Sequence, residues 1–201
     1  SYTDHQNAPK DILSSVSLLS NVGMSLTKQR AGFGDCPSVH DLLNRLPLNL
    51  AYNHPKQLGQ DRIAVMMAAW SYDNRTKSKK NTFAVIDFGS CVTTDIVNSN
   101  GEHLGGNIDL GLLWRLRAAH SFSENLPMID IGDSAQDLEG FLANNTLQAL
   151  DFGIVSGFLR QQINHIKTCF EQYGVERVFL TGGQSSWIAK FLPKEEMREI
   201  I

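Results

Sequence analysis

Cysteine is scarce in this sequence, and its shortage argues against a small domain held together by zinc or by disulfides. The chain of 201 residues holds three cysteines, at positions 36, 91 and 169. They stand far apart, and no two form the Cys-x-x-Cys pair that zinc sites and redox disulfides use. An odd number of isolated cysteines predicts a protein of a reducing compartment, which we expect to be the cytoplasm.

Long apolar runs are absent as well. The most apolar stretch, residues 63–70, is far shorter than the roughly 20 residues that cross a bilayer. The first residues do not show the basic, apolar and small-residue order of a signal peptide. We therefore expect a soluble intracellular protein that has no membrane partner.

The sequence also has no excess of positive charge. Lys and Arg number 18 against 21 Asp and Glu, a net charge of −3, so no overall field attracts nucleic acid or an anionic membrane. His-Glu-x-x-His, Gly-x-Ser-x-Gly and Gly-x-x-x-x-Gly-Lys-Ser/Thr motifs are missing, which argues against zinc hydrolases, serine hydrolases and P-loop kinases. With 42% hydrophobic residues the chain can form its own core, and a small molecule is the expected partner.

The first part of the chain has the weaker pattern. An apolar and serine-rich run over residues 12–18 predicts a buried strand, and apolar residues at helical spacing predict a helix over residues 39–46. Asp61 stands before the apolar run 63–70, so we expect a mostly buried helix that starts at Asp61. Residues 74–81 predict a polar, basic loop without a function of its own.

The rest of the chain predicts three consecutive antiparallel strands, two helices, one more strand and a last helix. The strands are expected over residues 82–88, 91–97, 103–108 and 177–180, and the helices over residues 110–119, 146–170 and 185–191. This order is typical of an α/β lobe that binds a nucleotide.

A carboxylate stands at the first predicted hairpin. Asp87 ends a strand beside Gly89, where the backbone can turn sharply and approach a ligand. Amides and hydroxyls of this hairpin can donate to phosphate oxygens, and Asp87 can hold a cation that offsets nucleotide charge. A plain hairpin whose Asp accepts turn amides would show the same residues.

Two glycine pairs follow predicted strands. Thr181-Gly182-Gly183 lies between a buried strand and a helix, where unhindered amides suit a ribose or a phosphate. Gly105-Gly106 lies late in another strand. Because glycines also end strands and permit close packing, each pair leaves both a binding and a structural interpretation open.

The segment Gly59-Gln60-Asp61-Arg62 joins a carboxylate and a guanidinium at the start of the apolar helix. As a helix cap, Asp61 would accept free amides and Arg62 would face solvent. As a reactive site, Asp61 would accept a hydroxyl proton, and Arg62 would present its planar donor fork to a substrate carboxylate.

Taken together, the motifs resemble type III pantothenate kinase, a family of the actin-like, acetate-kinase and sugar-kinase superfamily. The family patterns are a tyrosine segment with Gly-x-Asp-Arg, then Asp-x-Gly-Thr-Ala-x-Thr-x-Asp, Gly-Gly-x-Ile-x-Pro-Gly, Asn-Thr-x-x-Ala-Ile and Leu-Thr-Gly-Gly. The matching segments here are Tyr52-Asn53-His54-Pro55 with Leu58-Gly59-Gln60-Asp61-Arg62, then residues 87–95, residues 105–111, residues 145–150 with Gly153 and Gly157, and residues 180–183. Their order and spacing agree from about Tyr52 to Pro193.

The resemblance implies an α/β fold of actin-like, or ribonuclease H-like, duplicated lobes. It also implies that ATP phosphorylates pantothenate to 4'-phosphopantothenate, the first step of coenzyme A biosynthesis, in a homodimer with its pocket at or near the subunit interface. By the same resemblance Asp61 is the general base, pantothenate contacts Tyr52, Gly59, Arg62 and Thr146, and ATP contacts Gly89, Ser90, Thr93, Thr181, Gly182 and Gly183. Asp87 would hold a monovalent cation, K⁺ or NH₄⁺, and Mg²⁺ would accompany the nucleotide.

The sequence departs from the family pattern at three points. Ser90-Cys91 stands where the family has Thr-Ala, and Leu110 replaces a proline. The family's opening Asp-x-Gly-Asn-Thr hairpin has no counterpart, so we expect an incomplete first lobe, about 50 residues short. Residues 1–75 would be the remainder of that lobe and residues 76–201 the C-terminal lobe. A non-catalytic ligand-binding or regulatory subunit, or another small-molecule kinase of the superfamily, would share these motifs.

Overall fold

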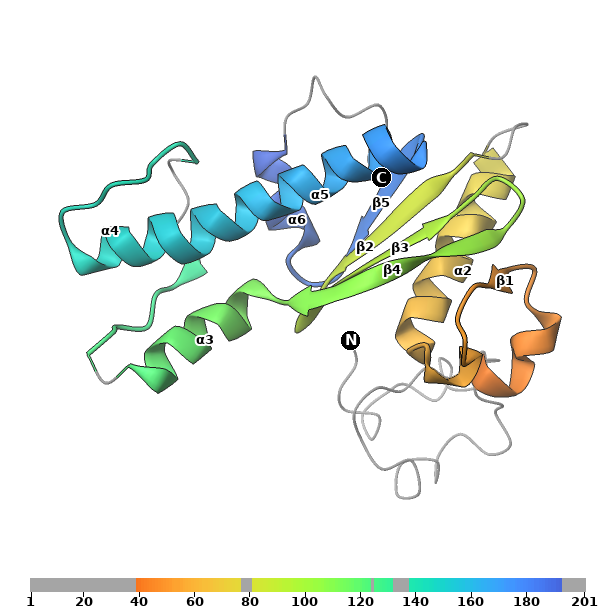
Figure 1. The fold of residues 1–201 in the computed structure, drawn as a ribbon, viewed down its shortest axis with the longest axis horizontal. Coiled ribbons are helices and arrows are strands. Elements are labelled where there is room, and N and C mark those ends of the chain that lie inside the picture. The colour runs from red at the N-terminus through yellow and green to blue at the C-terminus, as the bar shows by residue number, and fades with distance from the viewer. Residues whose placement is uncertain (1–38, 77–80, 124, 132–137, 193–201) are drawn as a thin grey trace, which may run out of the picture.

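The computed structural model describes residues 39–76, 81–123, 125–131 and 138–192, and these form one five-stranded sheet with helices on both faces (Figure 1). The strands are β1 (Asn49–Leu50), β2 (Phe83–Phe88), β3 (Cys91–Val97), β4 (Glu102–Leu110) and β5 (Arg177–Thr181). Their order in the sheet is β1-β4-β3-β2-β5. Strands β2, β3 and β4 are antiparallel neighbours, whereas β5 runs parallel to β2 and β1 runs parallel to β4.

The helices connect and cover these strands. They are η3 (Val39–Arg45), η4 (Pro55–Gln57), α2 (Gln60–Thr76), α3 (Leu112–Phe122), α4 (Thr146–Leu150), η6 (Asp151–Ser156), α5 (Gly157–Tyr173), α6 (Ser185–Ile188) and η7 (Ala189–Phe191). The segments α4, η6 and α5 follow one another without a break, and η6 is a π-helical turn between two α-helical stretches. No helix in the described part of the chain is both long and apolar enough to cross a membrane.

The α/β class predicted from the sequence is confirmed, and so are the strands and helices expected beyond residue 82, with ends that differ by a few residues. The helix expected over residues 39–46 is a 3₁₀ helix, and α2 continues into the segment predicted as a basic loop. The strand expected over residues 12–18 lies outside the described residues. The division into lobes at residues 75 and 76, and the duplication of the lobes, stay predictions.

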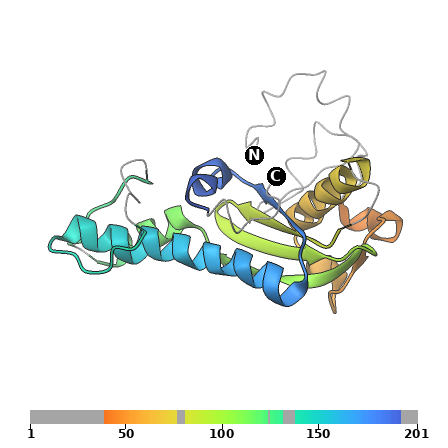
Figure 2. The same cartoon turned by 90° about the horizontal axis from the view of Figure 1, so that it is seen from above.

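Strand alternation separates two cores, one on each face of the sheet. In β2, Ala84, Ile86 and Phe88 belong to the core that α5 covers, whereas Phe83 and Val85 belong to the core that α2 covers. Figure 2 shows the two helices on opposite sides of the sheet. Because side chains alternate along a strand, Asp87 shares the α2 face with Phe83 and Val85. The predicted site residues therefore have to be sought on that face.

Candidate functional site

Asp87 lies near the end of β2 with a threonine on each side. It pairs with Thr93 of β3 and with Thr181 of β5. Residues paired across neighbouring strands point to the same face, so the two hydroxyls flank the carboxylate on the α2 face. The structure thus places three of the predicted site residues in one row across the sheet.

Glycines allow the backbone to close around this carboxylate. Gly182, directly after β5, has a φ of 90°, and an added Cβ there would collide with Oδ1 of Asp87. An added Cβ at Gly89 would lie 3.6 Å from the same oxygen. The amide of Gln184 donates to the carbonyl of Phe88 at 3.2 Å, which ties the turn after β5 to the end of β2. Both glycine turns predicted to meet ATP therefore meet at Asp87.

The remaining two residues predicted to contact ATP lie at the tips of these turns. Ser90 is exposed between β2 and β3, and Gly183 is exposed between β5 and α6. Both residues therefore lie on the surface at the edge of the Asp87 row, and the carbonyl of Ser90 accepts a hydrogen bond from the amide of Gly111 at 3.0 Å.

Asp61 stands in the first turn of α2, as the sequence predicts. The carbonyl of Gly59 accepts the hydrogen bond from the amide of Ile63 at 3.1 Å, so Gly59 is the residue from which the helix starts. An added Cβ at Gly59 would collide with Oδ1 of Asp61. The glycine of this motif therefore leaves the space that the carboxylate occupies, and Asp61 remains partly exposed.

The charge of Asp61 contributes to the electrostatics of Asp87. Partial burial raises the pKa of Asp87 above its ordinary value, and the negative charge of Asp61 raises it further. The charge of Asp61 on α2 therefore acts on Asp87 on β2, and a cation bound at Asp87 would relieve this repulsion.

Arg62 does not face solvent, so that part of the helix-cap interpretation is wrong. Its side chain is only 4% exposed. Nε donates to Oδ2 of Asp95 at 2.8 Å, and Nη2 donates to Oδ1 at 2.7 Å. Nη1 donates to the hydroxyl of Tyr52 at 3.3 Å. The planar fork that the sequence assigned to a substrate is therefore occupied by Asp95.

Electrostatics hold this buried pair in its charged form. Burial alone would lower the pKa of Arg62, but the hydrogen bonds and charge of Asp95, with a contribution from Tyr52, raise it overall. Burial alone would raise the pKa of Asp95, but hydrogen bonds from His103 and Arg62 lower it below its ordinary value. Both groups are ionised at neutral pH.

Sequence reasoning assigned no role to two members of this cluster, His103 and Asp95, although the matched segment 87–95 ends on Asp95. Nε2 of His103 lies 2.8 Å from Oδ1 of Asp95, and the His103 ring stacks on Tyr52 with 6.2 Å between centroids. Asp95 pairs with Gly106 of β4, where an added Cβ would lie 2.7 Å from both Oδ1 of Asp95 and Nη2 of Arg62. At Gly106 close packing is therefore the correct interpretation. Period-two alternation along β3 from Thr93 was the signal that could have placed Asp95 on this face.

Thr146 is the one predicted residue that lies apart from the others. It is exposed in the first turn of α4, and Asn145 caps that helix by accepting a hydrogen bond from the amide of Gln148 at 2.9 Å. In Figures 1 and 2, α4 lies at the opposite end of the molecule from α2. Within one chain, Thr146 does not join the cluster around Asp61.

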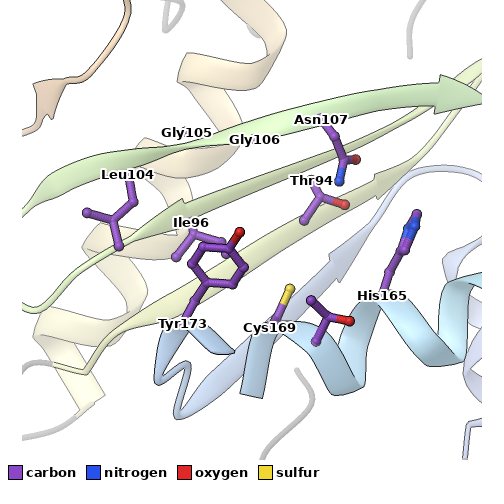
Figure 3. A pocket seen from close by; sticks show the side chains of 10 residues that line it. Thr94, Ile96, Leu104, Gly105, Gly106, Asn107, His165, Cys169 and Tyr173 are labelled. Atoms are coloured by element: carbon purple, nitrogen blue, oxygen red, sulfur yellow. The ribbon is translucent and has the colours of Figure 1, made fainter. Parts of the chain in front are cut away.

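A cavity of about 410 Å³ lies on the other face of the sheet, between β3, β4 and the C-terminal half of α5. Figure 3 shows Thr94 and Ile96 on β3 facing His165, Cys169 and Tyr173 on α5. Burial raises the pKa of the Cys169 thiol to about 11, so this thiol is protonated at neutral pH. The cavity is separated from Asp61 and Asp87 by the sheet and is not part of the predicted site.

The oxygen atoms around Asp87 suit a hard cation better than a transition metal. Within the described ranges, no three His, Cys, Asp or Glu side chains are grouped so as to hold a metal ion. The Asp87 row offers one carboxylate and two threonine hydroxyls on the same face. These donors fit an oxygen-binding cation of low charge.

Comparison with known proteins finds one family. The sequence model of the family described as "Type III pantothenate kinase" matches residues 4–168. A type III pantothenate kinase of Azobacteroides pseudotrichonymphae is 33% identical over 147 residues, which are 73% of this chain and 56% of that protein. One of Porphyromonas gingivalis is 29% identical over 178 residues, 87% of this chain and 70% of that protein. One of Flavobacterium johnsoniae is 30% identical over 146 residues, 73% of this chain and 56% of that protein.

Two solved structures are similar to parts of the chain. An Alp12 filament structure covers 63% of this chain and 43% of its own, with 16% identity and a TM-score of 0.42. An archaeal actin homologue in complex with ADP covers 66% of this chain and 47% of its own, with 13% identity and a TM-score of 0.40.

Proposed function

The chain belongs to the type III pantothenate kinase family, and we propose that it provides the base and the pantothenate-binding groups for ATP-dependent phosphorylation of pantothenate to 4'-phosphopantothenate. The observation that carries the proposal is the position of Asp61 in the first turn of α2, directly before the buried Arg62 and near enough to Asp87 for its charge to act there. Since the reaction consumes ATP, the proposal includes a cytoplasmic location.

Asp61 acts as the general base in this proposal. Its carboxylate takes the proton of the pantothenate hydroxyl, the hydroxyl oxygen forms a bond to the γ-phosphorus, and the bond from that phosphorus to the β,γ-bridging oxygen breaks as ADP leaves. The missing Cβ of Gly59 leaves the space in which the Asp61 carboxylate lies. Such a base commonly contributes about 10²–10⁴ in rate.

The Asp87 row serves the nucleotide. Backbone amides of Ser90, Gly182 and Gly183 donate to phosphate oxygens in this proposal. The amide of Gly89 donates to the carbonyl of Cys91 at 3.1 Å, so Gly89 serves by leaving room for the nucleotide. Asp87, with the hydroxyls of Thr93 and Thr181, would hold K⁺ or NH₄⁺. That cation, with Mg²⁺ on the nucleotide, would supply positive charge against the phosphates.

A second copy of the chain completes the pantothenate site by bringing its Thr146 to the Asp61 cluster. Two facts support this: Thr146 is remote from Asp61 within one chain, and large apolar side chains near it are exposed. Phe141 is 83% exposed and Leu142 is 87% exposed. A twofold dimer would bury these side chains. Mixing an Asp61→Asn variant with a Thr146→Val variant should restore about a quarter of wild-type turnover, since a mixed dimer carries one intact site; no restoration contradicts the shared site.

The test of the base is Asp61→Asn, measured by ADP release and by calorimetry with pantothenate. We expect turnover to fall by about 10²–10⁴ while pantothenate still binds. Asp41→Asn, which removes an exposed carboxylate from the first turn of η3, is the matched control and should retain turnover. Normal turnover in Asp61→Asn would overturn the proposal. Pantothenate binding without turnover in the wild type would indicate a ligand-binding subunit instead.

A further inference from the structure

One buried residue contacts Tyr52 and the carboxylate of Asp95, which holds Arg62, and nothing in the proposed reaction assigns it a role. We propose that His103 is a positioning residue: together with Asp95 it holds Arg62 and Tyr52 so that their remaining donors form one site for the substrate carboxylate. This inference rests on the proposed function.

The donors of Arg62 can be counted. A guanidinium has five N–H groups. Nε, one N–H of Nη2 and one N–H of Nη1 are used by Asp95 and Tyr52. The Nη2 side packs against Gly106, where an added Cβ would lie 2.7 Å away. The second N–H of Nη1 is therefore the donor of Arg62 that remains for a substrate.

Tyr52 adds the second donor. Its hydroxyl accepts the hydrogen bond from Nη1 of Arg62, which leaves the hydroxyl proton available to donate. The Nη1 N–H of Arg62 and the O–H of Tyr52 are thus neighbouring donors that originate from different segments. A carboxylate, with two oxygens, matches such a pair. Its affinity will depend on how firmly the two side chains are held relative to each other.

His103 contacts the supports of both donors. It is fully buried, its Nε2 donates to Oδ1 of Asp95 at 2.8 Å, and its ring stacks on Tyr52 at an interplanar angle of 17°. The ionised Asp95 is an acceptor only, so Nε2 carries the proton of this bond. One imidazole therefore fixes the carboxylate that holds Arg62 and the ring that carries the hydroxyl.

The backbone of β4 aims His103 at this position. The register shifts at Ile96 and Val97 of β3, where Ile96 pairs with Gly105 and Val97 pairs with His103. Leu104 is the extra residue of this bulge, and Gly105 has a φ of 120°. Because a bulge shifts the alternation of a strand, His103 and Gly106 both lie against the Arg62 and Asp95 pair.

Two variants separate the contacts of His103. His103→Gln keeps an N–H near the place of Nε2 but loses the ring, and His103→Phe keeps a ring for Tyr52 but loses the donor. Pantothenate and pantothenol, in which a hydroxymethyl group replaces the carboxylate, are the probes, and calorimetry gives both dissociation constants. We expect His103→Phe to weaken pantothenate binding about tenfold and to leave pantothenol binding unchanged, and His103→Gln to recover most of the loss.

Asp73→Asn is the matched control, because it weakens a buried Asp–Arg pair at the other end of α2. It should lower the unfolding temperature and leave the preference for pantothenate over pantothenol unchanged. The wild type should bind pantothenate more tightly than pantothenol. If His103→Phe keeps the wild-type preference for pantothenate, or weakens the binding of both probes by the same factor, the positioning role alone is overturned. A wild type that binds no pantothenate would overturn the proposed function and this inference with it.

Discussion

Two buried Arg–Asp pairs near the two ends of α2 join that helix to the sheet. The helix supplies the arginine of one pair and the aspartate of the other. Near its N-terminal end, Arg62 of α2 pairs with Asp95 of β3. Near its C-terminal end, Asp73 of α2 pairs with Arg177 of β5. In each pair both side chains are at most 4% exposed. The same chemistry therefore fixes both ends of one helix.

The surroundings of the two pairs are also alike. The guanidinium carbon of Arg62 lies 5.8 Å from the centroid of the Tyr52 ring, and that of Arg177 lies 5.9 Å from the centroid of the Phe179 ring. A further residue donates to each carboxylate: His103 to Asp95, and Asn81 to Asp73. What differs is the aromatic partner, because Tyr52 has a hydroxyl and Phe179 has none.

The difference teaches that a buried ion pair alone does not identify a functional site. Breaking such a pair costs stability wherever it lies, because a charge remains buried without its partner. Function depends on which hydrogen-bond donors of the arginine remain free and on which polar groups lie beside the pair. Arg62 follows the proposed base Asp61 and contacts a hydroxyl, whereas Arg177 lies under Phe179 in the core.

Deleting the arginines should have the largest effect. Arg62→Met and Arg177→Met each strand a buried aspartate, so each should lower the free energy of unfolding by about 3–5 kcal/mol in urea titrations. Only Arg62→Met should also abolish pantothenate binding, measured by calorimetry under native conditions. Loss of binding in both variants would show that binding follows stability, and the contrast between the two pairs would be wrong.

Removing both partners of a pair should reverse part of that loss. In Asp73→Leu/Arg177→Met and in Asp95→Leu/Arg62→Met no charge remains buried, so each double variant should regain roughly 2–4 kcal/mol over its arginine variant. The second double variant should still bind no pantothenate. Recovery of binding along with stability would mean that Arg62 acts only as a support of the fold.

Acid should weaken the Arg62 cluster in a defined range. Burial alone would raise the pKa of Asp95, but His103 and Arg62 lower it, so the folded protein holds its carboxylate more strongly than the unfolded chain does. This contribution is complete above the unfolded pKa of about 4 and is lost as pH falls toward the lower folded pKa. The unfolding free energies of wild type and Asp95→Asn should differ by a constant amount from about pH 7 to 5 and converge below about pH 4. If the difference between these two unfolding free energies grows as the pH falls, Asp95 does not have a lowered pKa in the folded protein.

The smallest effects should come from Tyr52 and Asn81, which each hydrogen-bond to one member of a pair. Tyr52→Phe removes one hydroxyl, and we expect pantothenate affinity to fall about 3–10-fold while stability changes by less than about 0.5 kcal/mol. Asn81→Ala removes a donor to Asp73, and we expect stability to fall by about 1 kcal/mol with affinity unchanged. Calorimetry measures the affinity of both variants and urea titration their stability. The prediction is wrong if the two variants lose the same affinity or the same stability.

Local periodicity explains how much of the fold could be predicted. Alternation and helical spacing are short-range signals, so β2, β3 and α5 follow from the sequence. The Asp87 row depends on register between β2, β3 and β5, which no single segment encodes, although the glycine and carboxylate motifs pointed to its members.

The Arg62 cluster was harder to predict for two reasons. An arginine in the first turn of a helix is usually exposed, and only the partner on β3 makes its burial favourable. His103 gives no signal of its own, because its direction depends on a one-residue bulge between β3 and β4. The position of Thr146 relative to Asp61 depends on the length of the whole α4 to α5 segment and not on its motif.

The direction of Thr146 depends on the number of residues in the helical segment that follows it, and that segment contains a π-helical turn. A π turn holds one residue more than the α turns around it, and each residue of an α-helix advances the helix by about 100°. Losing one codon within Asp151–Ser156 would remove that extra residue and leave the two ends of the helix in nearly the same orientation. Losing one codon within Leu147–Leu150, which is regular α-helix, would instead rotate Thr146 by about that angle relative to α5. An in-frame deletion could thus disable the proposed site without altering any residue in it. The number of residues in this helix therefore matters to the proposed site as much as their identity.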